Sequence, residues 1–192
     1  MDIEEIQQRI INADQLHISG STNQASPTAN NILNMSEYAG LIEYHPEELV
    51  MIVKAGTSIK EISQVLAQNG QILPFSVQSN NESSIGSAYA IGSPELSDAI
   101  LGIKIIDGQG RLLTFGGQVM KNVAGYDVSR LLVGSKGRYS VICEISFKVL
   151  PDAYATQNSK QKGITGIQNA SEVRTRIEQG LKAIFDPRAV FI

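Results

Sequence analysis

Thiol and imidazole side chains are scarce in this chain of 192 residues, which contains one cysteine and two histidines. A lone cysteine, Cys143, excludes an internal disulfide and argues against a cysteine-based metal site. Because Cys143 lies in an alternating apolar stretch, we expect a buried, unreactive thiol. His17 and His45 belong to no His-x-His or His-Cys pattern, so we expect both to be structural. The sequence therefore indicates neither a metal centre nor a hydrolytic triad.

Positive charge and long apolar runs are also scarce. The net charge is −3 and lysines and arginines do not cluster, so nucleic acid is not an expected partner. No stretch approaches the roughly 20 apolar residues of a transmembrane segment. The acidic start MDIEEIQQ is unlike a signal peptide, and we expect a cytoplasmic protein. A composition of 42% hydrophobic and 18% charged residues is typical of a globular chain.

The most unusual stretch runs from Gly116 to Gly137 and reads GGQVMKNVAGYDVSRLLVGSKG. Its glycines permit backbone conformations and close approaches that a Cβ would prevent. Asp127 is placed to cap a short helix, with Val128, Leu131 and Leu132 as its buried stripe. The residues alone leave two interpretations open: a phosphate- or cofactor-binding loop, or a glycine-rich turn between a hairpin and a strand.

Hydrophobic periodicity predicts most of the other elements. Helices are expected over 2–13, 58–70 and 171–186, strands over 15–19, 41–44, 49–55, 72–76 and 138–150, and a hairpin over 102–116. Residues 25–40 are polar and turn-rich, which is typical of a surface loop. In the strand over 138–150, we expect the odd-numbered residues from Tyr139 to Val149 to share one face.

The change from β-α units to hairpin strands near residue 75 predicts an α+β fold with two lobes in one domain. A β-α lobe is expected over about 1–74 and a mainly antiparallel sheet lobe with helices over about 75–151. Residues 152–170 have the composition of a linker. The closing helix over 171–186 carries an apolar stripe that includes Ile177 and Ile184, and we expect this stripe to pack back on the domain.

Two further segments are rich in small residues. The strand LHIS runs into Gly20, Ser21, Thr22 and Asn23, which can present N–H donors to phosphate oxygens or form an ordinary loop. The segment SSIGSAYAIGSPELSDAILG, which begins at Ser83, suits either tight packing or contact with a ligand.

The glycine-rich stretch, continued by SVICEISFKVLP, closely resembles the FAD domain of the flavin subunits of glycolate oxidase. These belong to the vanillyl-alcohol-oxidase (PCMH-type) flavoprotein superfamily, where the run reads approximately GGxVMKNVAGYDxSRLxxGSxGxLGVIxExSxKVLP. The chain meets nearly every fixed position of this run. The resemblance implies the two-lobed PCMH-type fold, with FAD as the cofactor.

The resemblance also implies which segments hold FAD. In the family, a loop such as GGGTK holds the pyrophosphate, and Ser21 stands here at its second glycine. A TIGG segment corresponds to Ser84–Ser87, and the arginine-bearing loop that follows it is shortened to 93–97. The glycine-rich turn lies at the flavin, and backbone groups early in the last strand reach the adenine. The implied contacts are Gly20, Ser21, Thr22, Asn23, Ser84, Ile85, Gly86, Ser87, Asn122, Gly125, Gly134, Ser135, Gly137, Val141 and Ile142.

The C-terminal run LKAIFDPRAVFI resembles the family's closing LKxxFDPxGxFNPGR, but the substrate (cap) domain that the family places before it is replaced by some twenty residues. The implied function is an FAD-binding module of a glycolate oxidase-like, flavin-dependent 2-hydroxy-acid oxidoreductase. Such a module needs partner subunits for a substrate site, and no residue is identified as a catalytic base. The alternative is a degenerate, non-catalytic domain that binds FAD weakly or not at all, because both phosphate segments have exchanged a glycine for serine. A complete dehydrogenase in this one chain is disfavoured.

Overall fold

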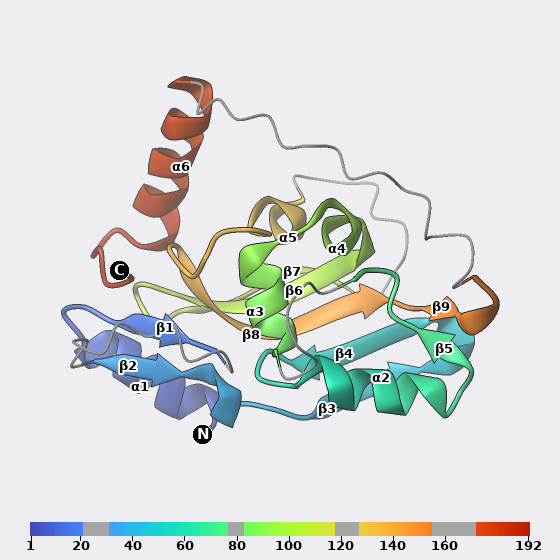
Figure 1. The fold of residues 1–192 in the computed structure, drawn as a ribbon. Coiled ribbons are helices and arrows are strands. Elements are labelled where there is room, and N and C mark those ends of the chain that lie inside the picture. The colour runs from blue at the N-terminus through green and yellow to red at the C-terminus, as the bar shows by residue number, and fades with distance from the viewer. Residues whose placement is uncertain (21–30, 77–82, 118–126, 155–171) are drawn as a thin grey trace.

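A five-stranded antiparallel sheet lies at the centre of the molecule (Figure 1). The computed structural model describes residues 1–20, 31–76, 83–117, 127–154 and 172–192. The strand order is β3-β4-β8-β6-β7. The strands are β3 (Leu41–His45), β4 (Val50–Lys54), β6 (Ile100–Asp107), β7 (Leu112–Gly116) and β8 (Ser140–Lys148). This antiparallel sheet with helices packed on it confirms the predicted α+β class.

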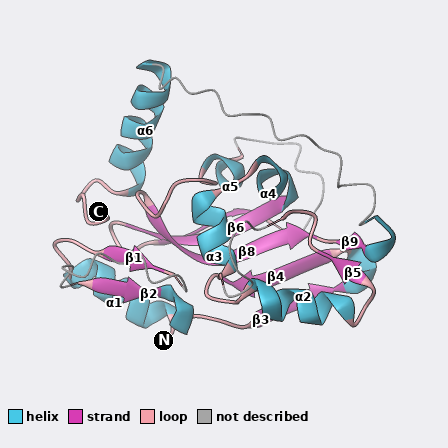
Figure 2. Ribbon diagram, in the orientation of Figure 1, coloured by secondary structure: helices cyan, strands magenta, loops and turns pink. Residues whose placement is uncertain are grey.

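Two hydrophobic cores lie on opposite faces of this sheet (Figure 2). One core is formed with α2 (Ile59–Ala67), α3 (Ile85–Ile91), α4 (Pro94–Ala99) and α5 (Val128–Leu131). The other is formed with α1 (Ile3–Asn12), the parallel pair β1 (His17–Ser19) and β2 (Ile32–Asn34), and the C-terminal Val190 and Phe191. The remaining elements are the antiparallel pair β5 (Gln71–Ile72) and β9 (Leu150–Pro151), the 3₁₀ turns η1 (Met35–Glu37), η2 (Pro46–Glu48) and η3 (Asp152–Tyr154), and α6 (Glu172–Phe185).

Side-chain caps begin the helices that carry the helical core. Ser58 accepts a hydrogen bond from the Glu61 amide at 3.1 Å, and Asp127 accepts one from the Arg130 amide at 3.1 Å. Both caps were predicted, and each satisfies an N–H group that the first turn leaves without an intrahelical acceptor. The prediction that the apolar residues after Asp127 are buried is wrong for Leu131, which is 49% exposed.

The central strand β8 contributes to both cores, which corrects the prediction that its odd-numbered residues share one face. Val141 and Cys143 pack in the core beneath α1, whereas Ile145 and Phe147 pack in the helical core. The register with β6 shifts at Cys143, because Lys104 pairs with Glu144 while Ile105 pairs with Ile142. One extra residue in β8 at this bulge reverses the alternation of its side chains.

The antiparallel sheet combines strands from both sides of the boundary expected near residue 74. Strand β4 pairs with β8 from Val50↔Lys148 to Lys54↔Glu144, so two strands of the expected first lobe belong to the main sheet. The prediction of a surface loop over 25–40 is wrong at Ile32–Asn34, because these residues form β2 and pair in parallel with β1.

No helix in the described parts of the chain is long and apolar enough to cross a membrane.

The last turn of α6 contacts the sheet, while the rest of the helix extends away from it (Figure 1). The ring of Phe185 is buried and meets Phe115 edge-on at 6.0 Å between centroids. The buried Asp186 carboxylate accepts from the amides of Val190 and Phe191, both at 2.9 Å, and from Lys182 Nζ at 2.6 Å. Phe185 of the predicted apolar stripe is thus buried, whereas Ile177 and Ile184 remain 49% and 64% exposed.

Candidate functional site

The end of β1 lies against the first turn of α3. A Cβ on Gly20 would overlap Ser87 Oγ and lie 3.4 Å from Ser84 Oγ. Only glycine therefore fits at position 20 without displacing the serines. Three other predicted contacts of this loop, Ser21, Thr22 and Asn23, fall outside the described residues.

Backbone hydrogen bonds already engage the amides at the start of α3. The N–H of Ile85 donates to Thr57 O at 2.9 Å, and that of Gly86 donates to Ala55 O at 2.8 Å. The Ser87 amide donates to Ser84 Oγ at 3.2 Å, and the two serine hydroxyls are 3.0 Å apart. Because these amides have protein acceptors, they are not available as main-chain donors to a phosphate.

The loop over 132–138 is attached to the C-terminal half of α3. Gly134 has φ +80°, and its amide donates to Tyr89 O at 3.0 Å. The Lys136 amide donates to Ala90 O at 3.0 Å. A Cβ on Gly92 would lie 2.8 Å from the Gly134 nitrogen, so the two backbones approach as closely as glycine allows. These contacts fix the loop beside α3.

The same loop also reaches β1. Gly137 has φ +73°, and a Cβ there would lie 3.4 Å from Ile18 Cδ1. The segments containing Gly20, Ser84–Ser87 and Gly134–Gly137 therefore meet in one region, although they are far apart in the sequence. Asn122 and Gly125, predicted as flavin contacts, belong to the part of the chain that the structure does not describe.

Ser135 carries a hydroxyl group suited to a ligand. The residue is 4% exposed, and its Oγ has no hydrogen-bond partner among the described residues. A buried hydroxyl without a partner costs about 1–3 kcal/mol, so such a group calls for an explanation. Tyr89, whose backbone carbonyl accepts from the Gly134 amide, donates its hydroxyl to Ser129 O, and burial raises the pKa of Tyr89 above its usual value. The neutral phenol joins α3 to α5.

Val141 and Ile142 can contribute only backbone groups to a ligand. Their side chains are buried in opposite cores, with 0% and 7% exposed. Both residues pair with β6, whereas β4 pairs with β8 from Glu144 to Lys148. On the side of β8 that faces away from β6, Val141 and Ile142 are therefore not paired with β4.

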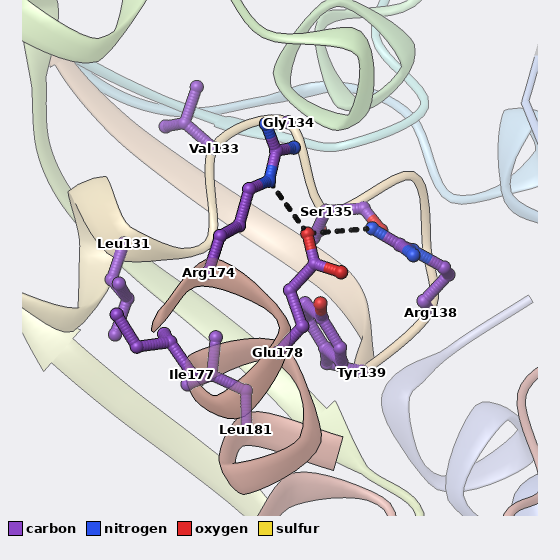
Figure 3. A pocket seen from close by; sticks show the side chains of 10 residues that line it. All are labelled: Leu131, Val133, Gly134, Ser135, Arg138, Tyr139, Arg174, Ile177, Glu178 and Leu181. Atoms are coloured by element: carbon purple, nitrogen blue, oxygen red, sulfur yellow. Dashed lines mark hydrogen bonds and ion pairs between the residues drawn. The ribbon is translucent and has the colours of Figure 1, made fainter. Parts of the chain in front are cut away.

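A cavity of about 360 Å³ lies between this loop and α6 (Figure 3). Its lining consists of Leu131, Val133, Gly134, Ser135, Arg138, Tyr139, Arg174, Ile177, Glu178 and Leu181. The sequence did not single out Arg138, Arg174 or Glu178 as a group. No spacing rule could have done so, because α6 is brought to the loop by tertiary packing alone.

Residues 16–116 match the family model described as an FAD binding domain, and this match covers more than half of the 192-residue chain. The chain belongs to the FAD binding domain family. The match includes two of the three converging segments, Gly20 and Ser84–Ser87. The unpartnered Ser135 hydroxyl and the positive-φ glycines of its loop fit FAD, whereas the engaged amides of α3 fit it less well.

Relatives of this FAD binding domain are glycolate oxidase subunits and dehydrogenases. The chain is 38% identical to glycolate oxidase subunit GlcE of Escherichia coli over 172 residues, which span 83% of the chain and 49% of that protein. It is 28% identical to glycolate oxidase subunit GlcD of Bacillus subtilis, over 58% of the chain and 25% of that protein. It is 25% identical to a D-lactate dehydrogenase of Archaeoglobus fulgidus, over 69% of the chain and 32% of that protein. The chain thus spans about half or less of these relatives.

Proposed function

We propose that the chain is the FAD-binding module of a glycolate oxidase-like, flavin-dependent 2-hydroxy-acid oxidoreductase. The observation that carries the proposal is the meeting of β1, α3 and the glycine loop, through the contacts of Gly20, Ser87 and Gly137, in a chain of the FAD binding domain family. The similarity to two glycolate oxidase subunits selects the oxidoreductase class. Partner subunits would supply the substrate site, and we expect the complex to act in the cytoplasm.

Each converging segment has a role in this proposal. Gly20–Asn23 and the segment Ser84–Ser87 would lie along the pyrophosphate. Asn122, Gly125 and the Gly134–Gly137 loop would hold the flavin and its ribityl chain, and backbone groups of Val141 and Ile142 would meet the adenine. Bound FAD supplies the hydride-accepting chemistry. The protein's own contribution is to bind and orient the cofactor, since no described residue is a candidate base.

One observation favours a second candidate, a domain that keeps the fold but binds FAD weakly or not at all. The amides of Ile85 and Gly86 already have backbone acceptors, and the hydroxyl of Ser87 fills the space beside Gly20. Each missing N–H contact to a phosphate would weaken binding by about 1 kcal/mol, or roughly fivefold. The protein would then purify largely without flavin.

Absorbance near 450 nm during titration of the purified protein with FAD distinguishes the two candidates. Saturable binding by the unmodified chain is expected from the FAD-binding module. In the same assay, Ser135→Ala should weaken FAD binding about three- to tenfold, as expected for one lost hydrogen bond. The free energy of unfolding of this variant without FAD should be unchanged or higher, because the hydroxyl has no hydrogen-bond partner to lose in the described parts of the chain.

Ser63→Ala, at an exposed position in α2, is the matched control and should leave FAD binding unchanged. Absence of binding at millimolar FAD would contradict the FAD-binding module and support the degenerate domain.

A further inference from the structure

Part of the apolar stripe of α6 stays on the surface of the molecule. Ile177, Gly180 and Ile184 follow one another at spacings of three and four residues, so they lie along one side of the helix. The side chains of Ile177 and Ile184 are 49% and 64% exposed. The N-terminal part of α6 extends away from the sheet (Figure 1). An apolar side therefore lies open on a projecting helix.

Gly180 lies between the two isoleucines on this side of the helix. None of the described residues lies within 4 Å of a Cβ built on Gly180, and its φ is not positive. Neither crowding nor a turn therefore requires glycine here, although glycine destabilises an exposed helix relative to alanine. A glycine flanked by exposed isoleucines is suited to the close approach of a second helix.

Leu131 of α5 extends the apolar surface. It is 49% exposed and lines the same cavity as Ile177, and Figure 3 shows the two side chains next to each other. Single exposed apolar residues are common on proteins, whereas adjoining ones mark interaction sites. We call Leu131, Ile177, Gly180 and Ile184 together the α6 face.

We propose that the α6 face binds the same face of a second copy of this chain, with the two α6 helices antiparallel. A twofold axis beside Gly180 places Ile177 of one copy opposite Ile184 of the other, and brings the two glycines together where the helices cross. Each isoleucine gains an apolar partner, and the surface is complementary to itself, as a twofold dimer requires. This interaction is additional to the FAD-binding function, and its test needs no FAD.

The position of α6 on the molecule favours the antiparallel arrangement. Its C-terminal end is attached to the sheet through Phe185, and its N-terminal end projects (Figure 1). Antiparallel helices therefore hold the rest of the two copies at opposite ends of the pair, whereas parallel helices would crowd them at one end. The charges also permit the pairing. The exposed Arg176 flanks the α6 face and would lie across from Ala183 of the other copy, so it meets no like charge there.

Sedimentation velocity of the full chain without FAD tests the proposal. The pairing should be weak, because two helices of 14 residues form a small interface beside the roughly 800 Å² per partner of a stable complex. The chain should pass from monomer to dimer between about 10 μM and about 1 mM. A chain that stays monomeric over this whole range would overturn the proposal and leave the α6 face to a different protein.

An isoleucine variant and its control test the location of the interface. Ile184→Lys buries a charge against Ile177 of the other copy and should weaken dimerisation at least tenfold. Ile91→Lys is the matched control, because Ile91 is a similarly exposed isoleucine, 67%, at the end of α3. The control should leave the equilibrium unchanged, and an equal loss in both variants would contradict the location.

Gly180→Leu separates close helix packing from general hydrophobic attraction. Leucine favours the helix and adds apolar surface, so loss of folding would not explain a weaker dimer. Its side chain should keep the two helices apart and weaken dimerisation at least tenfold. Stronger association of this variant would contradict a close crossing at Gly180.

Disulfide cross-linking under a mild oxidant tests the antiparallel register. A mixture of the Ile177→Cys and Ile184→Cys proteins should cross-link faster than either variant alone, because only the mixture places one thiol opposite another. Faster cross-linking of each single variant with itself would indicate parallel helices and overturn the arrangement. The native Cys143 does not compete, because it is 0% exposed.

Discussion

Gly20 lies so close to Ser87 that a Cβ on the glycine would overlap the serine hydroxyl. The hydroxyl is held there by Ser84, whose Oγ is 3.0 Å away. The contact joins the end of β1 to the first turn of α3. It also fills space beside Gly20 that the family resemblance reserves for the close approach of a pyrophosphate.

We expect glycine at the two exchanged positions to strengthen FAD binding. Ser87→Gly removes the hydroxymethyl group beside Gly20, and Ser21→Gly restores the family pattern in the preceding loop. Together they should raise FAD affinity tens of fold, equivalent to about 2 kcal/mol from recovered contacts. Flavin absorbance near 450 nm gives the dissociation constant.

Ser63→Gly in α2 is the control for this gain, because it places glycine inside an exposed helix at a similar cost of up to about 1 kcal/mol in stability. The control should leave FAD affinity unchanged. A double variant that binds no better than the unmodified chain would contradict a blocking role for the serines.

The contact between Gly20 and Ser87 should appear as energetic coupling. Gly20→Ala forces Ser87 Oγ to rotate away from Ser84 Oγ, and the lost hydrogen bond should lower the free energy of unfolding by about 1 kcal/mol. In a Ser87→Gly background most of that loss should disappear, since the obstructing group is gone. Urea denaturation of the four proteins measures the coupling, and additive effects would argue against the contact.

The last turn of α6 should carry most of the stability that this helix contributes. Phe185→Ala removes a buried ring that meets Phe115, and should cost about 3 kcal/mol in unfolding free energy. Ile184→Ala is the neighbouring control, and its 64% exposed side chain should cost less than about 1 kcal/mol. Ending the chain at residue 170 should likewise lower Tm. An unchanged Tm would contradict the attachment of α6.

The thiol of Cys143 should be unreactive in the folded protein. Burial, reinforced by the neighbouring Glu144, raises the pKa of Cys143 from 9.0 to about 12. The folded thiol therefore stays protonated at pH 8, and a disulfide reagent should react with it only after denaturation. Rapid reaction under native conditions would contradict this burial.

The same shift predicts a loss of stability at high pH. Because the unfolded thiol releases its proton near pH 9 and the folded thiol near pH 12, stability should fall as pH rises between these values. Tyr38, whose pKa burial raises from 10.0 to about 12, adds to the fall above pH 10. Cys143→Ala should reduce the slope between pH 9 and 10, where the thiol titrates before the tyrosine.

Local patterns in the sequence determined the α+β class, most elements and the family. Helix caps such as Ser58 and Asp127 and the hairpin of β6 and β7 depend on residues close together in the chain, so their physics is visible in the sequence. The run from Gly116 to Gly137 pointed to a flavin domain, in agreement with the family match over 16–116.

Only the tertiary structure decided which distant segments meet. The bulge at Cys143 reverses the faces of β8, the β4–β8 pairing extends the sheet into the first part of the chain, and β2 forms only because β1 lies beside it. The same holds for the closeness of Gly20 to Ser87 and for the arginines beneath α6. Such contacts depend on the packing of the whole chain, and no local spacing encodes them.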